Sequence, residues 1–180
     1  MDDFYIGKIC NGDHDAFRYF IKTYKDIAYS IAISVVKDEF IAQEVTQDAF
    51  MKAFKNIGSF SKKSTFSTWF YRIVMNEALM RLRKLKKEII DFTDINDDDI
   101  SDENAILSLK EDEQTYLINE ALRKLSSRES LALRLFYLQE ESVKEVCEIT
   151  GWSEANTKII LHRARKNMFV VLTQLMKTDL

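Results

Sequence analysis

The chain has 180 residues, a formal net charge of −3, 46% hydrophobic residues and no proline. This composition is ample for one or two packed cores, and it favours uninterrupted helices. The negative net charge argues against a protein that coats nucleic acid indiscriminately. No apolar run approaches the roughly 20 residues that span a bilayer. The acidic start MDDFY is unlike a secretory signal.

Two helical segments are predicted in the first third of the chain. Apolar residues recur at steps of three and four over residues 13–36, which predicts one long helix or two consecutive ones. Asp38 is a suitable cap for the next helix, which we expect to run to about Asn56 and to stop at Gly58. The polar face of that helix is acidic and suits a basic partner, although ordinary solvation explains it equally well from this helix alone.

The stretch SFSKKSTFS, residues 59–67, has hydroxyls, two lysines and two phenylalanines but no strand pattern. Such a loop can grip single-stranded nucleic acid, with lysines on phosphate and aromatics on a base. The alternative is a connector whose phenylalanines pack into the core. A third helix is expected over Thr68 to Lys87, and positive charge gathers near its end. Cations suit a helix C-terminus, but five of them in seven positions indicate a surface that tracks a nucleic-acid backbone.

Residues 91–103, DFTDINDDDISDE, hold seven acidic side chains and no basic one. Self-repulsion and weak hydrophobicity predict a linker between two domains. The acidic run can be a passive tether, can shield a basic surface, or can thread a basic channel on a partner.

The second half of the chain ends in a predicted helix-turn-helix. Ser126 with Glu129, and Ser142 with Glu145, have the spacing of capping boxes. Gly151 is suited to end the helix after Ser142, and Ser153 to start the next one. A short helix, a glycine turn and a basic second helix form a pattern that lays its second helix in a DNA major groove. A packed pair of helices with a solvated basic face is the alternative.

No catalytic or metal chemistry is indicated by the sequence. His14 and His162 have no second ligand at metal spacing and no nucleophile beside them. Cys10 and Cys147 lie far apart, so reduced thiols in a cytoplasmic protein are expected. We therefore expect a protein that is not an enzyme and that needs no cofactor or small-molecule substrate.

In their order, these pieces resemble the extracytoplasmic-function group of bacterial RNA polymerase sigma factors. AQEVTQDAFMKAF (42–54) looks like the region-two helix that docks on the polymerase clamp. FSTWFYRIVMNEALMRLRK (66–84) looks like the helix that handles the promoter minus-ten element. The segment 125–166 is similar to region four, which reads the minus-thirty-five element. Each stretch is moderately specific, and the three in order around a variable linker are strongly so.

The resemblance implies three sets of contact residues. The residues that it implies for docking on polymerase are Glu44, Gln47 and Asp48. Contact with the minus-ten element, including a flipped non-template base, falls on Phe60, Lys62, Lys63, Ser64, Phe66, Arg72, Asn76, Arg81, Arg83 and Lys84. Contact with the minus-thirty-five element falls on Ser153, Asn156, Lys158, His162, Arg163, Arg165 and Lys166.

The recognition helix departs from the family pattern. Where the family usually has Thr-Val-Lys-Ser-Arg, this chain has Asn156-Thr157-Lys158-Ile159-Ile160. Isoleucine cannot donate to a base edge or a phosphate, so we expect Ile160 to weaken the minus-thirty-five contacts. Asn156 can read adenine instead if it faces the groove.

We predict an all-helical protein with a region-two domain at 1–90, an acidic linker at 91–111 and a region-four domain at 112–180. The resemblance implies that it binds RNA polymerase core and promoter DNA, opens the DNA, and is held by an anti-sigma protein without entering the membrane itself. Two alternatives are a stand-alone helix-turn-helix regulator and a sigma-like decoy that binds an anti-sigma protein. Whether the two domains separate or pack together in the free protein is left open by the sequence.

Overall fold

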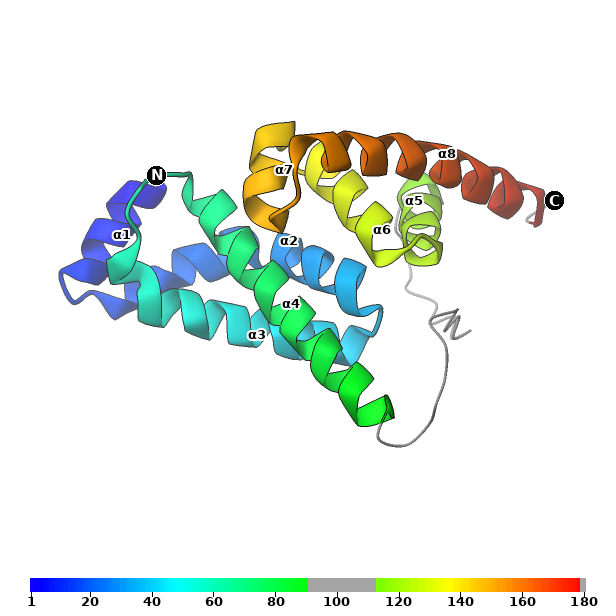
Figure 1. The fold of residues 1–180 in the computed structure, drawn as a ribbon. Helices are drawn as coiled ribbons and strands as arrows, with labels where there is room; N and C mark the ends of the chain where they lie inside the picture. The colour runs from blue at the N-terminus through cyan, green and yellow to red at the C-terminus, as the bar shows by residue number, and fades with distance from the viewer. Residues whose placement is uncertain (91–112, 179–180) are drawn as a thin grey trace.

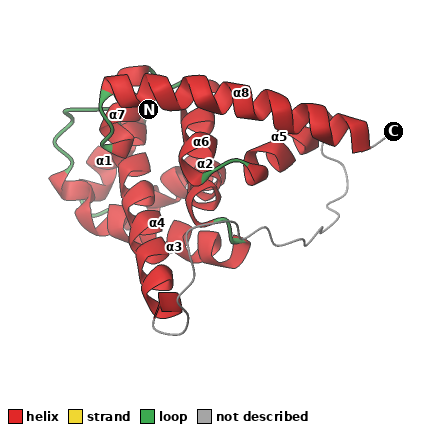
Figure 2. Ribbon diagram, turned by 45° about the vertical axis from the view of Figure 1, so that its right-hand side comes forward, coloured by secondary structure: helices red, strands yellow, loops and turns green. Residues whose placement is uncertain are grey.

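The computed structural model describes residues 1–90 and 113–178, with side chains over 1–85 and 114–176. Within these ranges the chain is helical and has no strand, as predicted (Figures 1 and 2). The elements in order are α1 (Asp2–Cys10), η1 (His14–Phe17), α2 (Arg18–Val36), α3 (Glu39–Asn56), η2 (Ile57–Ser59), α4 (Phe66–Ile90), α5 (Glu113–Lys124), α6 (Ser127–Leu133), the π-helical turn η3 (Arg134–Leu138), α7 (Val143–Thr150) and α8 (Glu154–Thr178).

The helix ends follow local signals in the sequence. The Asp38 carboxylate accepts a hydrogen bond from the Ile41 amide at 2.8 Å and caps α3. Both predicted capping boxes are formed, at the starts of α6 and α7. Gly151 ends α7 in the left-handed conformation, with φ of 75°. These predictions are confirmed because each depends only on residues within one turn of the helix end.

The first domain packs α2, α3 and α4 around an aromatic core. Phe20 of α2 and Phe70 of α4 are fully buried. The Phe66 ring lies 4.2 Å from that of Phe20, and Phe50 lies 4.6 Å from Phe70, both measured between ring centroids. Burial of this apolar surface is the main stabilising contribution to the domain.

Helix α1 was not predicted, and it is held by contacts with α2. The Tyr5 ring stacks on the Tyr19 ring with centroids 4.0 Å apart. The Asp2 carboxylate accepts hydrogen bonds from the hydroxyls of Tyr19 at 2.9 Å and Tyr24 at 2.6 Å. Burial, and then the adjacent Asp2, raise the pKa of Tyr24, so its hydroxyl stays a donor.

The second domain is formed by α5 to α8. Leu122 of α5 and Leu125, which directly follows α5, pack with Leu133 of α6 and Ala164 of α8. A neighbouring cluster joins Ala132 to the inner face of α8. Helix α8 continues well past the helix-turn-helix to Thr178 and reaches the C-terminal end of the described chain (Figure 1).

The two domains are packed together, which settles the question that the sequence left open. Leu131, Leu135, Val146 and Ile149 of the second domain belong to the same buried cluster as the core of α2 and α4. We call these four residues, with the α2 and α4 surfaces that they cover, the clasp. Helices α6 and α7 therefore lie directly against the first domain (Figure 1).

Polar contacts reinforce the clasp on the α2 side. The Ser130 and Ser34 hydroxyl oxygens are 3.4 Å apart, and both residues are almost fully buried. The Lys37 ammonium donates to the Leu122 carbonyl at the end of α5, at 3.0 Å. The Arg134 guanidinium donates to the Ser30 hydroxyl at 2.6 Å, although burial lowers the pKa of Arg134 to about 10. The predicted acidic linker lies outside the described residues.

Candidate nucleic-acid and polymerase interfaces

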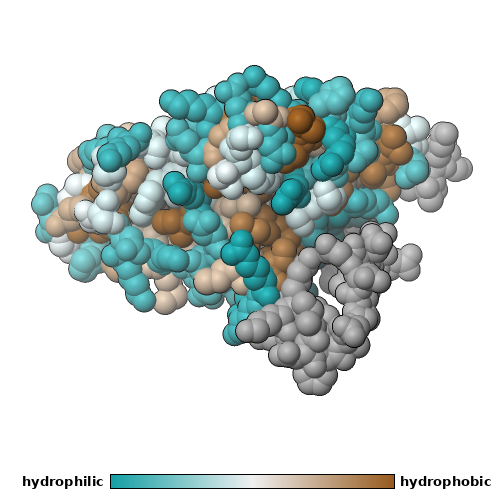
Figure 3. Space-filling view, in the orientation of Figure 1, coloured by the Kyte–Doolittle hydropathy of each residue, from teal (hydrophilic) through white to brown (hydrophobic). Residues whose placement is uncertain are grey.

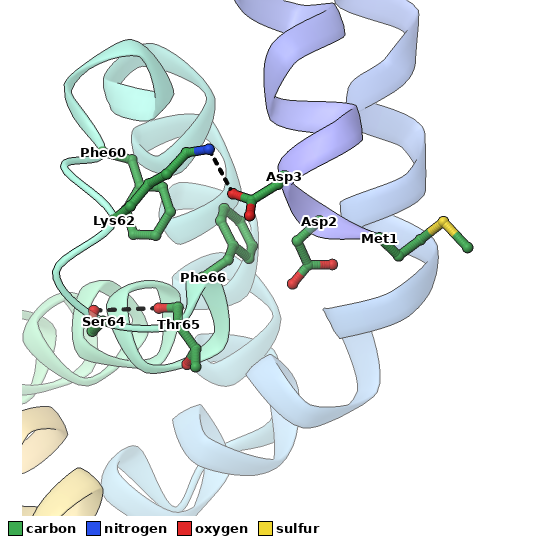
Figure 4. Close-up of a pocket in the computed structure, with 8 residues that line it drawn as sticks. All are labelled: Met1, Asp2, Asp3, Phe60, Lys62, Ser64, Thr65 and Phe66. Carbon is green, nitrogen blue, oxygen red and sulfur yellow. Dashed lines mark hydrogen bonds and ion pairs between the residues drawn. The ribbon is translucent and has the colours of Figure 1, made fainter.

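The loop between η2 and α4 borders a pocket of about 350 Å3 (Figure 4). Thr65 caps α4, because its hydroxyl accepts from the Thr68 amide at 3.2 Å. Phe60 is half-buried against Trp69, with ring centroids 5.2 Å apart. Lys63 is exposed and Ser64 is half-buried. The pocket is lined by Met1, Asp2, Asp3, Phe60, Lys62, Ser64, Thr65 and Phe66.

The position of Phe66 corrects one prediction. We expected its ring to be part of a loop that grips DNA, but Phe66 is only 3% exposed. It is the first residue of α4, and its ring packs among Phe20, Tyr24 and Phe70. The alternative that the sequence also allowed, a phenylalanine packed into the core, holds for Phe66, which forms the floor of the pocket rather than a free stacking platform.

Helix α1 supplies a wall of this pocket that sequence reasoning missed. The Lys62 ammonium forms an ion pair with the Asp3 carboxylate at 2.9 Å (Figure 4). This hydrogen bond lowers the pKa of the Asp3 carboxyl, so the group is ionised at neutral pH. The only available signal was the acidic pair that starts the chain, and nothing local places it beside a loop about sixty residues later.

The cations of α4 are divided between two faces of the helix. Arg72, Asn76 and Arg83 are exposed and lie at positions that share one face. Arg81 lies on another face, where its guanidinium donates to the Glu44 carboxylate of α3. The structure therefore gives Arg81 a partner on α3 and places it apart from the face that carries Arg72 and Asn76, whereas its assignment to the DNA-contacting set stays a prediction. Lys84 is exposed and lines the groove between α3 and α4.

The acidic face of α3 borders that groove. Gln47 and Asp48 are exposed, whereas the Glu44 side chain is 38% exposed because Arg81 covers part of it. The groove has a volume of about 220 Å3 and is lined by Val45, Asp48, Glu77, Met80, Arg81 and Lys84. The buried Glu77 carboxylate pairs with the Lys52 ammonium at 2.5 Å, which joins α3 to α4 a second time.

The helix-turn-helix has the predicted geometry and an exposed outer helix. The Ser153 hydroxyl accepts from the Asn156 amide at 3.3 Å and caps α8. Figure 3 shows hydrophilic residues over most of the surface where α7 and α8 lie, around smaller apolar patches. The other predicted contact residues on α8 are all exposed: Asn156, Lys158, His162, Arg163, Arg165 and Lys166.

The expected effect of Ile160 is wrong. Ile160 is 3% exposed and packs inside the second domain with Leu161, so it presents nothing to a groove and weakens nothing there. Ile159 is the exposed one, at 64%. Adjacent positions on a helix point about 100° apart, so Ile160 faces the core while Ile159 faces outward.

Three of the outward cations already have partners within the domain. The Arg163 guanidinium donates to Glu129 at 2.9 Å, and Arg165 donates to the Tyr137 hydroxyl at 3.0 Å. Lys158 pairs with Glu154 at 2.6 Å, one turn earlier on the helix. Burial alone would raise the pKa of the Glu129 carboxyl, but hydrogen bonds from Ser126 and Arg163 lower it overall. Glu129 thus fixes the direction of Arg163.

Two kinds of site are not found in the described part of the chain. None of its helices is both long enough and apolar enough to cross a membrane. Over the same residues, no group of three or more histidine, cysteine or acidic side chains is arranged to hold a metal ion.

Comparison with known proteins assigns the family. Residues 20–88 match the model of sigma-70 region 2, and residues 115–168 match that of sigma-70 region 4. The chain is an extracytoplasmic-function sigma factor of the sigma-70 family. Such a protein binds RNA polymerase core and directs it to promoters, as predicted. The acidic α3 face, the basic α4 face and the helix-turn-helix all lie within the two matched segments.

Two relatives agree with this assignment, and a solved structure shares the fold. The ECF RNA polymerase sigma factor SigW of Bacillus subtilis (strain 168) is 30% identical over 173 residues, which cover 89% of this chain and 91% of the relative. SigM of the same organism is 32% identical over 81% of this chain and 88% of the relative. The sigma factor RpoE from Bartonella quintana, solved with the anti-sigma factor NepR, matches with a TM-score of 0.70 at 24% identity, over 87% of this chain and 96% of that one.

Proposed function

We propose that this sigma factor docks on RNA polymerase core through the acidic face of α3, made of Glu44, Gln47 and Asp48. The observation that carries this proposal is the separation of charge within the first domain. On α3, Gln47 and Asp48 are exposed and Glu44 is partly exposed, while Arg72, Asn76 and Arg83 share an exposed face of α4. A protein that must bind a basic partner and DNA together needs these two surfaces apart.

The minus-ten element is held by the exposed face of α4 and by the pocket beside it. Arg72 and Arg83 meet phosphate, and Lys62 and Lys63 do so from the loop. A base flipped out of the stack enters the pocket against Phe60, with Phe66 as its floor. Unstacking a base costs a few kcal/mol, which stacking and phosphate contacts offset once the strand is displaced. No nucleotide hydrolysis or catalytic residue of the sigma factor is required.

The minus-thirty-five element is read by α8 from the second domain. The start of α8 carries Ser153, Asn156 and Lys158. The N-terminal end of a recognition helix is the part that contacts base edges. Arg163 and Arg165, with His162 and Lys166, follow the phosphates. In free protein several of these side chains are paired internally, and phosphate replaces Glu154 as the partner of Lys158 on binding.

Promoter binding requires the clasp to open. The two elements are about 25 base pairs apart, or roughly 85 Å of duplex at about 3.4 Å per base pair. A compact chain of this length has a radius of gyration of only roughly 16 Å. We assign domains to 1–90 and 112–180, so that the acidic tether 91–111 keeps both on one promoter and raises the effective concentration of the second reader.

An anti-sigma protein is the expected regulator, acting in the cytoplasm. The fold matches a sigma factor solved in complex with one, and the exposed α3–α4 groove is a surface that such a partner can cover. An anti-sigma protein that covers Gln47 and Asp48 would exclude polymerase from the same face of α3.

Run-off transcription with purified core polymerase and genomic fragments tests the proposal. Wild type is expected to initiate from particular fragments. Asp48→Arg is expected to abolish initiation and retention on core, whereas Asp26→Arg, an exposed acid on α2, leaves both unchanged. Tight binding to duplex DNA without initiation from any fragment would overturn the proposal and favour a stand-alone regulator.

A further inference from the structure

The pocket beside the loop is completed by the first residues of α1. Phe60, Ser64, Thr65 and the buried Phe66 come from the loop and the start of α4, and Met1, Asp2 and Asp3 close the opposite side (Figure 4). A base that enters this pocket therefore meets an aromatic surface on one side and carboxylates on the other. The identity of the accepted base depends on which polar groups at that edge are still available.

Most of the polar groups around the pocket are already occupied. Both oxygens of Asp2 accept hydrogen bonds, one from Tyr19 and one from Tyr24. The Thr65 hydroxyl is bonded to the hydroxyls of Ser67 and Thr68, each at 2.8 Å. The Ser64 hydroxyl donates to the Thr65 carbonyl at 3.3 Å.

Asp3 is the acidic side chain that remains available. One of its oxygens pairs with Lys62, and the other has no hydrogen-bond partner among the described residues. Its side chain is 72% exposed and lies at the mouth of the pocket, so it can move toward a base without disturbing the core. The Tyr5 stack and the Asp2 hydrogen bonds meanwhile hold α1 in place.

A strand that passes the loop will change the partner of Lys62. Phosphate competes for an exposed ammonium, and an exposed ion pair contributes little to hold it back. When Lys62 turns to phosphate, Asp3 is left as an acceptor with no donor. An ionised carboxylate can only accept hydrogen bonds.

The four bases differ in what they offer such an acceptor. Cytosine, adenine and guanine each carry an exocyclic amino group, a donor, whereas thymine carries none and presents two carbonyl oxygens. A carboxylate attracts the amino group and repels the carbonyl oxygen. We propose that Asp3 accepts a hydrogen bond from the exocyclic amino group of the flipped base, so that this sigma factor favours a base with an amino group, which is cytosine, adenine or guanine, over thymine in the pocket. This inference rests on the proposed function of the loop.

The test uses holoenzyme and a library of non-template-strand oligonucleotides randomised over the minus-ten element. Bound molecules are sequenced for wild type, Asp3→Asn, Asp3→Ala and Asp3→Glu. We expect one position at which wild type depletes thymine about tenfold relative to the three bases that carry an amino group. Asp3→Asn and Asp3→Ala remove this preference, because an amide donates to a carbonyl as well as accepting and a methyl group does neither. Asp3→Glu restores part of it.

Two controls separate base reading from loss of structure or of strand binding. Asp26→Asn, an exposed acid far from the pocket in sequence, should leave the preference unchanged. Lys62→Ala should weaken retention of all oligonucleotides alike, as expected for a phosphate contact. Thermal unfolding of Asp3→Asn should match wild type, because Asp2 makes the contacts that hold α1.

The outcomes distinguish this inference from the proposed function. If wild-type holoenzyme selects a sequence but Asp3→Asn retains the same base preferences at every position, Asp3 does not read the base and only this inference falls. A preference for thymine that disappears in Lys62→Ala would also overturn it, in favour of the lysine. If wild-type holoenzyme selects no sequence at all, the promoter-binding proposal falls with it.

Discussion

Arg81 of α4 donates a hydrogen bond to Glu44 of α3, so a residue expected on DNA is paired with one expected on polymerase. Both side chains are more than a third exposed, and the donor is the Nη2 of Arg81, whereas its buried Nε has no hydrogen-bond partner among the described residues. The pair therefore orients the Glu44 carboxylate at the edge of the α3–α4 groove. Arg81 therefore has a structural role, and the substitution Glu44→Arg should affect stability more than a substitution at a fully exposed position would.

Glu44→Arg should lower the free energy of unfolding by about 1 kcal/mol, because an ion pair is lost and two cations then face each other. It should also abolish retention on core polymerase. The double variant Glu44→Arg/Arg81→Glu should recover stability, since the pair is restored in reverse, but should not recover retention. Urea unfolding and co-purification with core measure the two effects. Recovery of retention in the double variant would mean that the pair itself, and not an acid on α3, is what polymerase needs.

Ser130→Arg should force the clasp apart. Ser130 faces Ser34 across the interface with 1% exposure, so a long charged side chain has no room there. The radius of gyration from solution scattering should rise and both domains should stay helical by circular dichroism. Gln114→Arg on α5, which is exposed, is the control. An unchanged radius of gyration with an unchanged unfolding midpoint would show that the two serines do not lie in a closed interface in solution.

Glu141 should make the clasp sensitive to pH. It is 9% exposed and directly precedes Ser142, the N-cap of α7, and α7 packs on α4. Burial first, and then the charge of Glu145, raise its pKa from 4.5 to about 7. Its folded-state pKa is thus above the unfolded value, so its contribution to stability is complete below pH 4.5 and is lost as pH rises to about 7.

The variant Glu141→Gln has no carboxyl to ionise and should not lose this stability. Its unfolding midpoint should therefore rise relative to that of wild type as the pH increases from 4.5 to 7. Lys37, whose pKa burial lowers to about 8, acts in a higher range and does not interfere. Parallel pH profiles for the two proteins would contradict the assignment. Glu148→Gln, an exposed acid on α7, is the matched control.

Lys158→Ala should weaken binding to duplex promoter DNA and reduce the slope of log affinity against log salt by about one. Its fold should be unaffected, because the pair with Glu154 is exposed to solvent and such a pair contributes little to the stability of a helix. Glu154→Gln provides the opposite test, since it releases Lys158 and should strengthen binding. An unaltered salt slope in Lys158→Ala would mean that this ammonium touches no phosphate.

The sequence could predict the features that depend on neighbouring residues. Both capping boxes and the Gly151 turn are local in this sense, and each is found where expected. The family resemblance supplied the rest of the architecture. Even so, a helix register is not fixed by composition, which is why the exposed isoleucine is Ile159 and not Ile160.

Features that depend on distant residues could not be predicted. Helix α1 exists because Asp2 meets tyrosines at positions 19 and 24, and the pocket exists because Asp3 meets Lys62. Arg81 looked like part of a basic run until Glu44 was placed beside it. No local pattern indicates whether an arginine on a long helix will face solvent or will pair with an acid on a neighbouring helix.

Helix α4 has consequences for mutational genetics. One side of it carries Arg72 and Asn76, another carries Arg81, and Tyr71 is buried in the cluster that includes the clasp. A loss-of-function screen that scores only transcript yield will recover lesions from all three sides and cannot sort them. Suppressor pairs will sort them, because compensation for an Arg81 lesion should arise in α3, whereas compensation for a Tyr71 lesion should arise in α7.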